Sequence, residues 1–151
     1  MNMLSKVSDE QISDEYRKRF ELKKGDFIKG GYDAAKHFNS KIGKRLDKEL
    51  FGAIFLNGRN QVITTEILFE GSVTQTAVYP REIIKRILEL DAAAIIIGHN
   101  HPSGNLNPSN NDLSITKKIK KACELIDCCL HDHLIVVQNG EFTSFVDRGL
   151  L

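Results

Sequence analysis

The sequence predicts one α/β or α+β domain built around a single mixed β-sheet. Segments with strand patterns and segments with helix patterns alternate along the chain, as they do in layered folds of this class. The chain has 151 residues, of which 41% are hydrophobic and 27% charged, enough for one hydrophobic core and too apolar for a disordered polypeptide. Neither an internal repeat nor a linker divides it.

The N-terminal part differs in character from the rest. Residues 1–25 are polar and carry charge at nearly every turn, so we expect a charged tail or a loosely attached helix there, followed by the domain over residues 26–151. Residues 32–46 predict an amphipathic helix over the sheet, because apolar side chains recur at helical intervals, at Ala34, Ala35, Phe38, Ile42 and Leu46. His37 lies beside this stripe without a second ligand four residues away, and we interpret it as a packing or surface histidine.

The next elements are a hairpin, a strand and a helix. Residues 51–56 and 61–67 flank an Asn-Gly turn and predict a β-hairpin. Alternation over residues 72–78 predicts a third strand. Pro80 is suited to the first position of a helix, whose buried face would consist of Ile83, Ile84, Ile87 and Leu88.

The C-terminal half predicts a buried strand, a helix and a second hairpin. Residues 92–97 are apolar throughout, as in a strand covered on both faces. A helix is expected after Pro108, with Ile115, Ile119, Ala122 and Ile126 inward and the lysines at 117, 118, 120 and 121 solvated. Residues 134–138 and 141–145 flank a second Asn-Gly turn.

Charge and cysteine content narrow the class of protein. The net charge is +1 with signs interleaved, which gives no support for a nucleic-acid partner. No apolar run approaches the ~20 residues of a membrane span, and no secretory signal begins the chain, so we expect a cytoplasmic protein without a membrane partner. The cysteines, Cys123, Cys128 and Cys129, are odd in number and clustered, and we interpret them as reduced, small apolar side chains.

The candidate chemistry lies in the polar loop that follows the buried strand. At a strand end, residues i and i+2 point to the same side, so His99 and His101 can aim both imidazoles at one point beyond the sheet. Ser109 is a natural N-cap for the next helix, and Asp112 falls at its third position, as in a capping box. Asp112 therefore has two competing roles, closing the helix or binding a metal with the histidines, and its place after His-x-His favours metal binding.

Two imidazoles and one carboxylate suit zinc, one ion per chain. Three protein ligands leave one position open, as in catalytic rather than structural zinc sites. Water at such a position ionises near neutral pH, so the ligand set predicts hydrolysis. The reaction also needs a general base, and spacing alone does not choose among the candidate glutamates, Glu49, Glu66, Glu70, Glu82 and Glu89.

These residues resemble a known family. The pattern His99-x-His101-x7-Ser109-x2-Asp112 matches the JAMM (MPN-plus) metalloprotease motif at every spacing. From about Gly31 to Leu151 the sequence resembles the RadC family. The segments that carry the resemblance are Val-Tyr-Pro-Arg-Glu-Ile at 78–83, His-Asn-His-Pro-Ser-Gly at 99–104, Asp-His-Leu-Ile-Val-Val at 132–137 and Arg-Gly-Leu-Leu at 148–151.

The resemblance implies a JAMM/MPN-type fold, a mixed, curved β-sheet flanked by helices. It implies zinc held by His99, His101 and Asp112 together with a water. It maps the catalytic glutamate onto Glu49, just ahead of the first core strand, and the motif serine onto Ser109, whose hydroxyl would stabilise the developing oxyanion. The implied function is a zinc-dependent peptidase or isopeptidase that acts on an unidentified polypeptide.

A second histidine pair and a second function complete the expectations. His131 and His133 repeat the spacing of the first pair without an evident carboxylate partner, and we interpret them as supporting or structural residues. Longer RadC proteins carry an N-terminal helix-hairpin-helix region linked to DNA contact, and only a short charged tail stands in its place here. The alternative functions are a DNA-repair accessory or DNA-binding module with structural zinc, and an inactive domain used for protein contacts.

Overall fold

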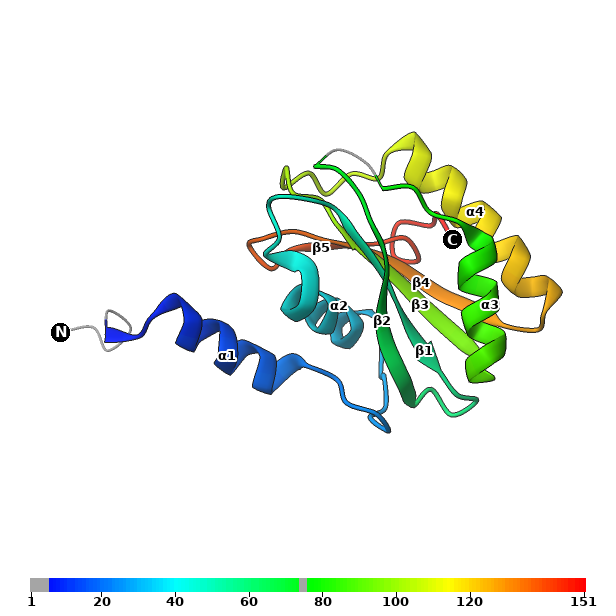
Figure 1. Cartoon of the computed structure of the whole chain (residues 1–151), viewed down its shortest axis with the longest axis horizontal. Coiled ribbons are helices and arrows are strands. Elements are labelled where there is room, and N and C mark those ends of the chain that lie inside the picture. Colours follow the sequence, from blue (N-terminus) through cyan, green and yellow to red (C-terminus); the bar gives the residue numbers. More distant parts are fainter. Residues whose placement is uncertain (1–5, 74–75) are drawn as a thin grey trace.

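A five-stranded sheet divides the molecule into layers in the computed structural model, which describes residues 6–73 and 76–151 (Figure 1). The strand order is β2-β1-β3-β4-β5. Only β3 and β4 run parallel, and the other neighbouring strands are antiparallel. The sheet is therefore mixed, as the sequence predicted, and consists of β1 (Leu50–Leu56), β2 (Val62–Glu70), β3 (Ala94–Asn100), β4 (Cys129–Val136) and β5 (Phe142–Ser144).

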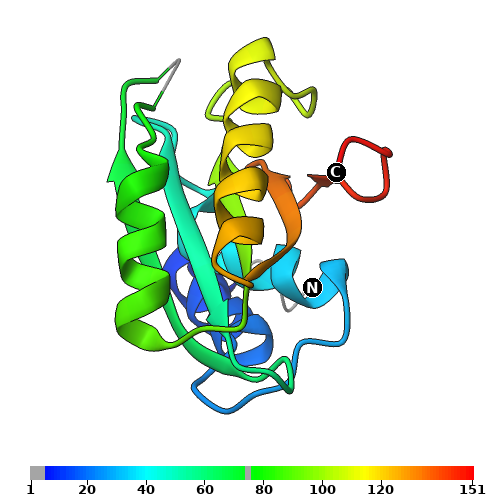
Figure 2. The same cartoon turned by 90° about the vertical axis from the view of Figure 1, so that its right-hand side faces the viewer.

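Helices cover both faces of the sheet. On one face lie α2 (Gly31–Phe38) and the short π-helix η2 (Asn39–Gly43), and on the other lie α3 (Pro80–Leu90) and α4 (Asn110–Leu125) (Figures 1 and 2). Every residue of β1 and β3 is buried, because each face packs against its own hydrophobic core. This arrangement confirms the predicted α+β class.

The alternation of side chains along β3 decides which residues reach which layer. Ile96 belongs to the core under α2, whereas Ile95 and Ile97 belong to the core under α3 and α4. Because this alternation has a period of two, His99 faces the α4 side and Asn100 faces the α2 side. The end of β3 thus presents His99 on one face of the sheet and Asn100 on the other.

Both predicted hairpins are confirmed. β1 and β2 pair antiparallel around the Asn57 turn, where the Asn57 side chain accepts hydrogen bonds from the backbone of Arg59 and Gln61 at 2.9 and 3.0 Å. β4 and β5 pair antiparallel as well. β4 begins five residues earlier than the predicted segment, at Cys129, and so carries His131 and His133 within the sheet.

Three details of the sequence prediction were wrong. The predicted strand over 72–78 is absent from its described residues, where the chain instead crosses from β2 towards α3; Thr74 and Gln75 lie outside the described residues. The helix predicted to reach residue 46 ends with η2 at Gly43, which leaves Leu46 51% exposed. Leu88 on α3 is 61% exposed, because Ile83 and Ile87 fill the contact with the sheet.

The charged N-terminal segment contains α1 (Asp9–Phe20), with a capping box at Ser8 and no buried residue. It lies beside α2 and η2 and points away from the sheet (Figure 1). A hydrogen bond of 2.8 Å from the Leu22 amide to His37 Nδ1 fixes the chain just after it. In the described part of the chain, no helix has both the length and the apolar character that crossing a bilayer requires.

Candidate metal centre

Two histidines converge at the end of β3. His99 is the penultimate residue of the strand and His101 follows it, so both side chains leave the same face of the sheet. Their Nε2 atoms lie 2.9 Å apart. The ring of His99 also stacks on Phe51 of β1, with centroids 5.9 Å apart, which orients the imidazole toward the loop.

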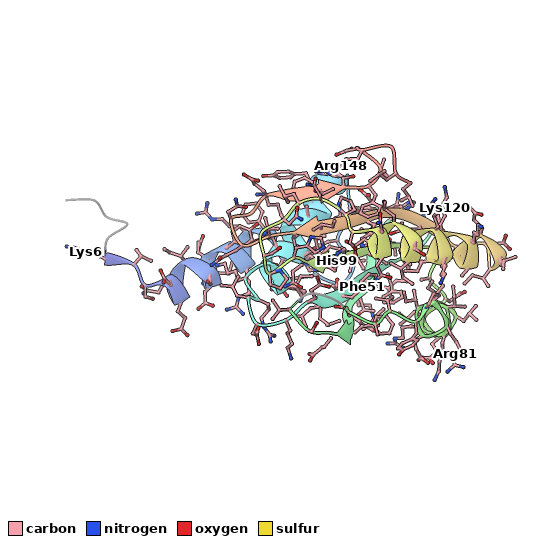
Figure 3. The ribbon with its side chains drawn as sticks, turned by 90° about the horizontal axis from the view of Figure 1, so that it is seen from above. Lys6, Phe51, Arg81, His99, Lys120 and Arg148 are labelled. Carbon is pink, nitrogen blue, oxygen red and sulfur yellow. The ribbon has the colours of Figure 1, made fainter. Side chains whose placement is uncertain are left out.

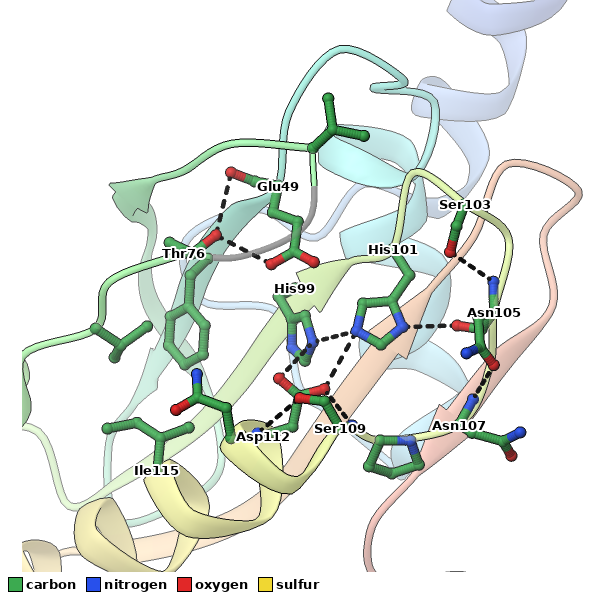
Figure 4. Close-up of a pocket in the computed structure, with 15 residues that line it drawn as sticks. Glu49, Thr76, His99, His101, Ser103, Asn105, Asn107, Ser109, Asp112 and Ile115 are labelled. Atoms are coloured by element: carbon green, nitrogen blue, oxygen red, sulfur yellow. Dashed lines mark hydrogen bonds and ion pairs between the residues drawn. The ribbon is translucent and has the colours of Figure 1, made fainter.

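Asp112 reaches the same point from the first turn of α4. Its Oδ1 lies 3.4 Å from His99 Nε2, and its Oδ2 lies 3.2 Å from His101 Nε2. Ser109 caps the helix: its hydroxyl accepts from the Asp112 amide at 3.0 Å, and its own amide donates to Asp112 Oδ2 at 2.9 Å. The carboxylate therefore fulfils the capping role and faces the histidines at once (Figure 4).

These three side chains form the one group of candidate metal ligands found among the described residues, with all ligand atoms within 4.8 Å of one another. The set fits a metal ion, because His101 Nδ1 lies 2.6 Å from the carbonyl oxygen of Asn105. A carbonyl can only accept, so Nδ1 carries the hydrogen and the neutral ring presents the Nε2 lone pair to the centre. The backbone carbonyl of Asn105 thus holds His101 in the tautomer that can bind a metal ion.

The electrostatics of the site favour a cation between the ligands. Burial raises the pKa of Asp112, but its close contacts with the imidazoles of His101 and His99 outweigh this effect and hold it well below its usual range. Burial lowers the pKa of His101, and its contacts with Asp112 and with the Asn105 carbonyl raise it above its ordinary value on balance. A negative carboxylate in a partly buried position is the partner that a metal ion or a proton requires.

Of the candidate bases, the structure brings only Glu49 to the site among the described residues. Glu49 is 8% exposed and lines the same cavity as the two histidines and Asp112. Its carboxylate points towards the imidazoles (Figure 4). Burial raises its pKa, and the nearby histidines and a hydrogen bond from Thr76 partly offset that shift.

The other candidate glutamates have different surroundings. Glu66 forms a bidentate ion pair with Arg86 at 2.7 and 2.8 Å, and Glu70 pairs with Lys48 at 2.6 Å. Glu82 and Glu89 line a separate surface pocket beside α3. Among these glutamates, Glu49 is therefore the one that lines the cavity with the candidate metal ligands.

The cavity in front of the centre has a volume of about 420 Å³. Its lining combines apolar side chains with side chains that carry hydroxyl and amide groups. Apart from Glu49 and the three candidate ligands, the described lining residues carry no formal charge; they are Phe51, Val73, Thr76, Val78, Ser103, Asn105, Asn107, Pro108, Ser109, Asn111 and Ile115. The cavity thus suits an uncharged segment of a substrate.

Sequence reasoning did not identify two residues that hold Glu49 in place. Thr76 donates a hydrogen bond of 3.1 Å to Glu49 Oε2. Asn100 accepts from the Leu50 amide at 2.6 Å and donates to the carbonyls of Arg45 and Lys48 at 3.0 and 3.1 Å. The only hint of this role in the sequence was the place of Asn100 between His99 and His101. Because side chains alternate along a strand, Asn100 points to the face of the sheet opposite the two histidines.

The two histidines of the second pair, His131 and His133, have different surroundings. His133 is fully buried, and its Nε2 lies 2.8 Å from His99 Nδ1, so it supports a candidate ligand, as one of our two interpretations had it. Burial lowers the pKa of His133 well below its ordinary value. His131 is exposed and contacts Asn60 and Cys129. His37 is a packing histidine, hydrogen-bonded to Thr65 at 2.8 Å.

The lysine run and two of the three cysteines fit their plain interpretations. All three cysteines are free thiols; Cys123 and Cys128 are buried as expected of small apolar side chains, whereas Cys129 is exposed. The four lysines of α4 are exposed, and Figure 3 shows Lys120 on the outside of the helix while His99 lies in the interior. The charge run is therefore a solvated helix face.

Fold and site together define a mixed α+β domain with a His-His-Asp candidate metal centre at one end of its sheet. Residues 28–150 match the RadC-like JAB domain, and the chain belongs to that family. It is 44% identical to a UPF0758 protein of Photobacterium profundum over 130 residues, 86% of this chain and 57% of that protein. A UPF0758 protein of Marinobacter nauticus is 38% identical over 151 residues, 100% of this chain and 62% of that protein. The chain thus spans about three-fifths of the length of these relatives.

Proposed function

We propose that this chain is a zinc-dependent hydrolase that cleaves a peptide or isopeptide bond in a polypeptide. The observation that carries the proposal is the convergence of His99, His101 and Asp112 on one point, with Glu49 across the same cavity. Two imidazoles and one carboxylate would hold the ion and leave a coordination position open. Zinc in such a site supplies Lewis acidity and lowers the pKa of a bound water.

Glu49 would act as the general base. Thr76 occupies Glu49 Oε2, so the other oxygen, Oε1, is left to take a proton from the attacking water and return it to the leaving amine. Partial burial raises the pKa of Glu49, which brings it closer to neutral pH, where a base that must also act as an acid is most effective.

Ser109 would stabilise the developing oxyanion. Its oxygen accepts the Asp112 amide hydrogen, so its own O–H can donate to the carbonyl oxygen of a substrate. The uncharged lining of the cavity supports a polypeptide whose residues beside the cleaved bond are neutral. The alternative with structural zinc is less well supported, since structural sites use four protein ligands and the described residues offer three.

A peptide library provides the test, because the substrate is unidentified. Zinc-loaded protein is incubated with proteome-derived peptides and with lysine-linked isopeptides, and products are read by mass spectrometry. Wild type should generate new termini, and Glu49→Gln should lose at least about 100-fold of this rate with its zinc retained. Glu70→Gln, a surface glutamate on β2, is the matched control and should cleave as wild type does. Cleavage by Glu49→Gln at the wild-type rate, or no cleavage by zinc-loaded wild type, would overturn the proposal.

A further inference from the structure

A buried chain of hydrogen bonds runs behind His99. His99 Nδ1 lies 2.8 Å from His133 Nε2, His133 Nδ1 lies 2.6 Å from Thr116 Oγ1, and Thr116 Oγ1 lies 2.6 Å from the carbonyl oxygen of Asp112. Three elements meet here. The parallel pairing of β3 with β4 puts both histidines on the face under α4, and α4 supplies Thr116.

The carbonyl at the end of this chain sets its direction. A carbonyl oxygen can only accept, so the Thr116 hydroxyl gives its single hydrogen to Asp112. The hydroxyl can then only accept from His133, whose Nδ1 must carry a hydrogen. The His133 ring contacts His99, Thr116 and the rings of Phe51 and Phe145, and none of these is an anion in contact with the ring that would compensate a buried positive charge.

A neutral His133 with hydrogen on Nδ1 has a bare Nε2, which accepts from His99. We propose that His133 and Thr116 are positioning residues that hold His99 as its Nδ1–H tautomer, with the Nε2 lone pair turned towards the metal. This inference rests on the metal binding of the proposed function and not on hydrolysis. If the chain ran in the reverse direction, hydrogen would sit on His99 Nε2 and block the ligand atom.

The two candidate histidine ligands thus reach the same tautomer by different routes. His101 uses a carbonyl four residues away, that of Asn105. His99 uses a chain through β4 and α4 that ends on the backbone of Asp112. Asp112 therefore has two roles. Its carboxylate is a candidate metal ligand, and its backbone carbonyl ends the hydrogen-bond chain that sets the tautomer of His99.

Nitrogen NMR on protein labelled with ¹⁵N-histidine reads the tautomers directly. We expect His99 and His133 of wild type to carry hydrogen on Nδ1, and Thr116→Val to lose this preference and to bind zinc about 10- to 100-fold more weakly, measured by competition with a chelator. Thr116→Ser keeps the hydroxyl and should restore both properties. The matched control is Thr65→Val, which removes the hydrogen bond to His37 and should change neither.

Several outcomes would overturn the proposal. One is hydrogen on Nε2 of His99 or His133 in wild type. Another is a folded Thr116→Val with wild-type histidine spectra and zinc affinity. If Thr116→Val does not fold, the wild-type tautomers and Thr116→Ser decide. Wild type that shows the expected tautomers but binds no zinc contradicts the proposed function and removes the metal that the tautomer is said to serve, whereas zinc binding without hydrolysis affects the proposed function alone.

Discussion

The side-chain oxygen of Asn100 accepts a hydrogen bond of 2.6 Å from the backbone amide of Leu50. This contact joins the strand end that bears the two histidines to the residue next to Glu49. The Asn100 amide group also holds the carbonyls of Arg45 and Lys48. One buried side chain therefore connects the candidate metal ligands with the segment that carries the candidate base.

Asn100→Ala should loosen the position of Glu49, the candidate base, without removing the metal site. The substitution leaves one amide and two carbonyls without their partner, which should lower the free energy of unfolding by about 1–3 kcal/mol. Zinc content should persist, because β3 still carries His99 and His101, while hydrolysis falls. Urea unfolding and metal analysis provide the measurements. Asn57→Ala, which removes turn hydrogen bonds at the other end of the sheet, should leave the ratio of turnover to bound zinc unchanged; an equal loss in both variants would contradict this role.

Thr76→Val should raise the pKa of Glu49. Burial already raises this pKa, and the Thr76 hydroxyl lowers it by hydrogen bonding to the carboxylate. A general base must be deprotonated, so the acidic limb of the rate profile should move to higher pH. Carboxyl ¹³C NMR follows the titration directly, with Glu49→Gln to assign the signal, and Thr76→Ser should behave as wild type. A titration unchanged in Thr76→Val would show that the hydroxyl does not tune the base.

Gly98→Ala should destabilise the fold next to the site. A Cβ at this position would lie 2.7 Å from the ring of Phe38, so the aromatic side chain must move, at a cost of about 1–3 kcal/mol in the free energy of unfolding. Phe38→Leu should make room, and the double variant should lose less than the sum of the two single losses. Gly58→Ala, where nothing lies within 4 Å, is the control. Additive losses would argue against this contact.

His37 should make stability depend on pH. Burial, followed by the charge of Lys41, lowers its pKa to about 4, whereas an unfolded histidine titrates near about 6.5. Between these values the unfolded chain binds more protons, so the unfolding free energy falls as pH falls, by on the order of 3 kcal/mol over the whole window. His37→Asn should show a shallower slope in denaturation curves, because only the share of His37 is lost and buried His133, whose pKa is also lowered, keeps its own; the exposed-site variant His131→Asn should keep the full slope. Equal slopes in wild type and His37→Asn would refute the assignment.

The convergence of the three candidate ligands could be expected from the sequence because their geometry is local. His99 and His101 share a strand end, and the capping box that places Asp112 needs only residues 109–112. The buried strand before the histidines was equally clear, since it is apolar at every position from residue 92 to 97. The alternation of side chains along a strand and the capping of a helix each depend on a few neighbouring residues. Both can therefore be recognised in a single sequence.

The support of the site could not be predicted in the same way. The contacts of Asn100 with Leu50, Thr76 with Glu49 and His133 with His99 join residues 27 to 50 positions apart. They depend on strand order and register, which neither propensity nor spacing specifies. The strand predicted over 72–78 failed for a related reason: alternation indicates strand potential, but Thr76 turns inward to bond Glu49 instead of extending a sheet.

The most direct test of the account is the zinc content of the purified protein. Elemental analysis compares wild type, His101→Ala and Glu49→Gln after dialysis against a trace of zinc. The account predicts about one zinc per chain in wild type and in Glu49→Gln, and none in His101→Ala. Wild type without zinc, or His101→Ala with as much zinc as wild type, would contradict a metal centre built from His99, His101 and Asp112.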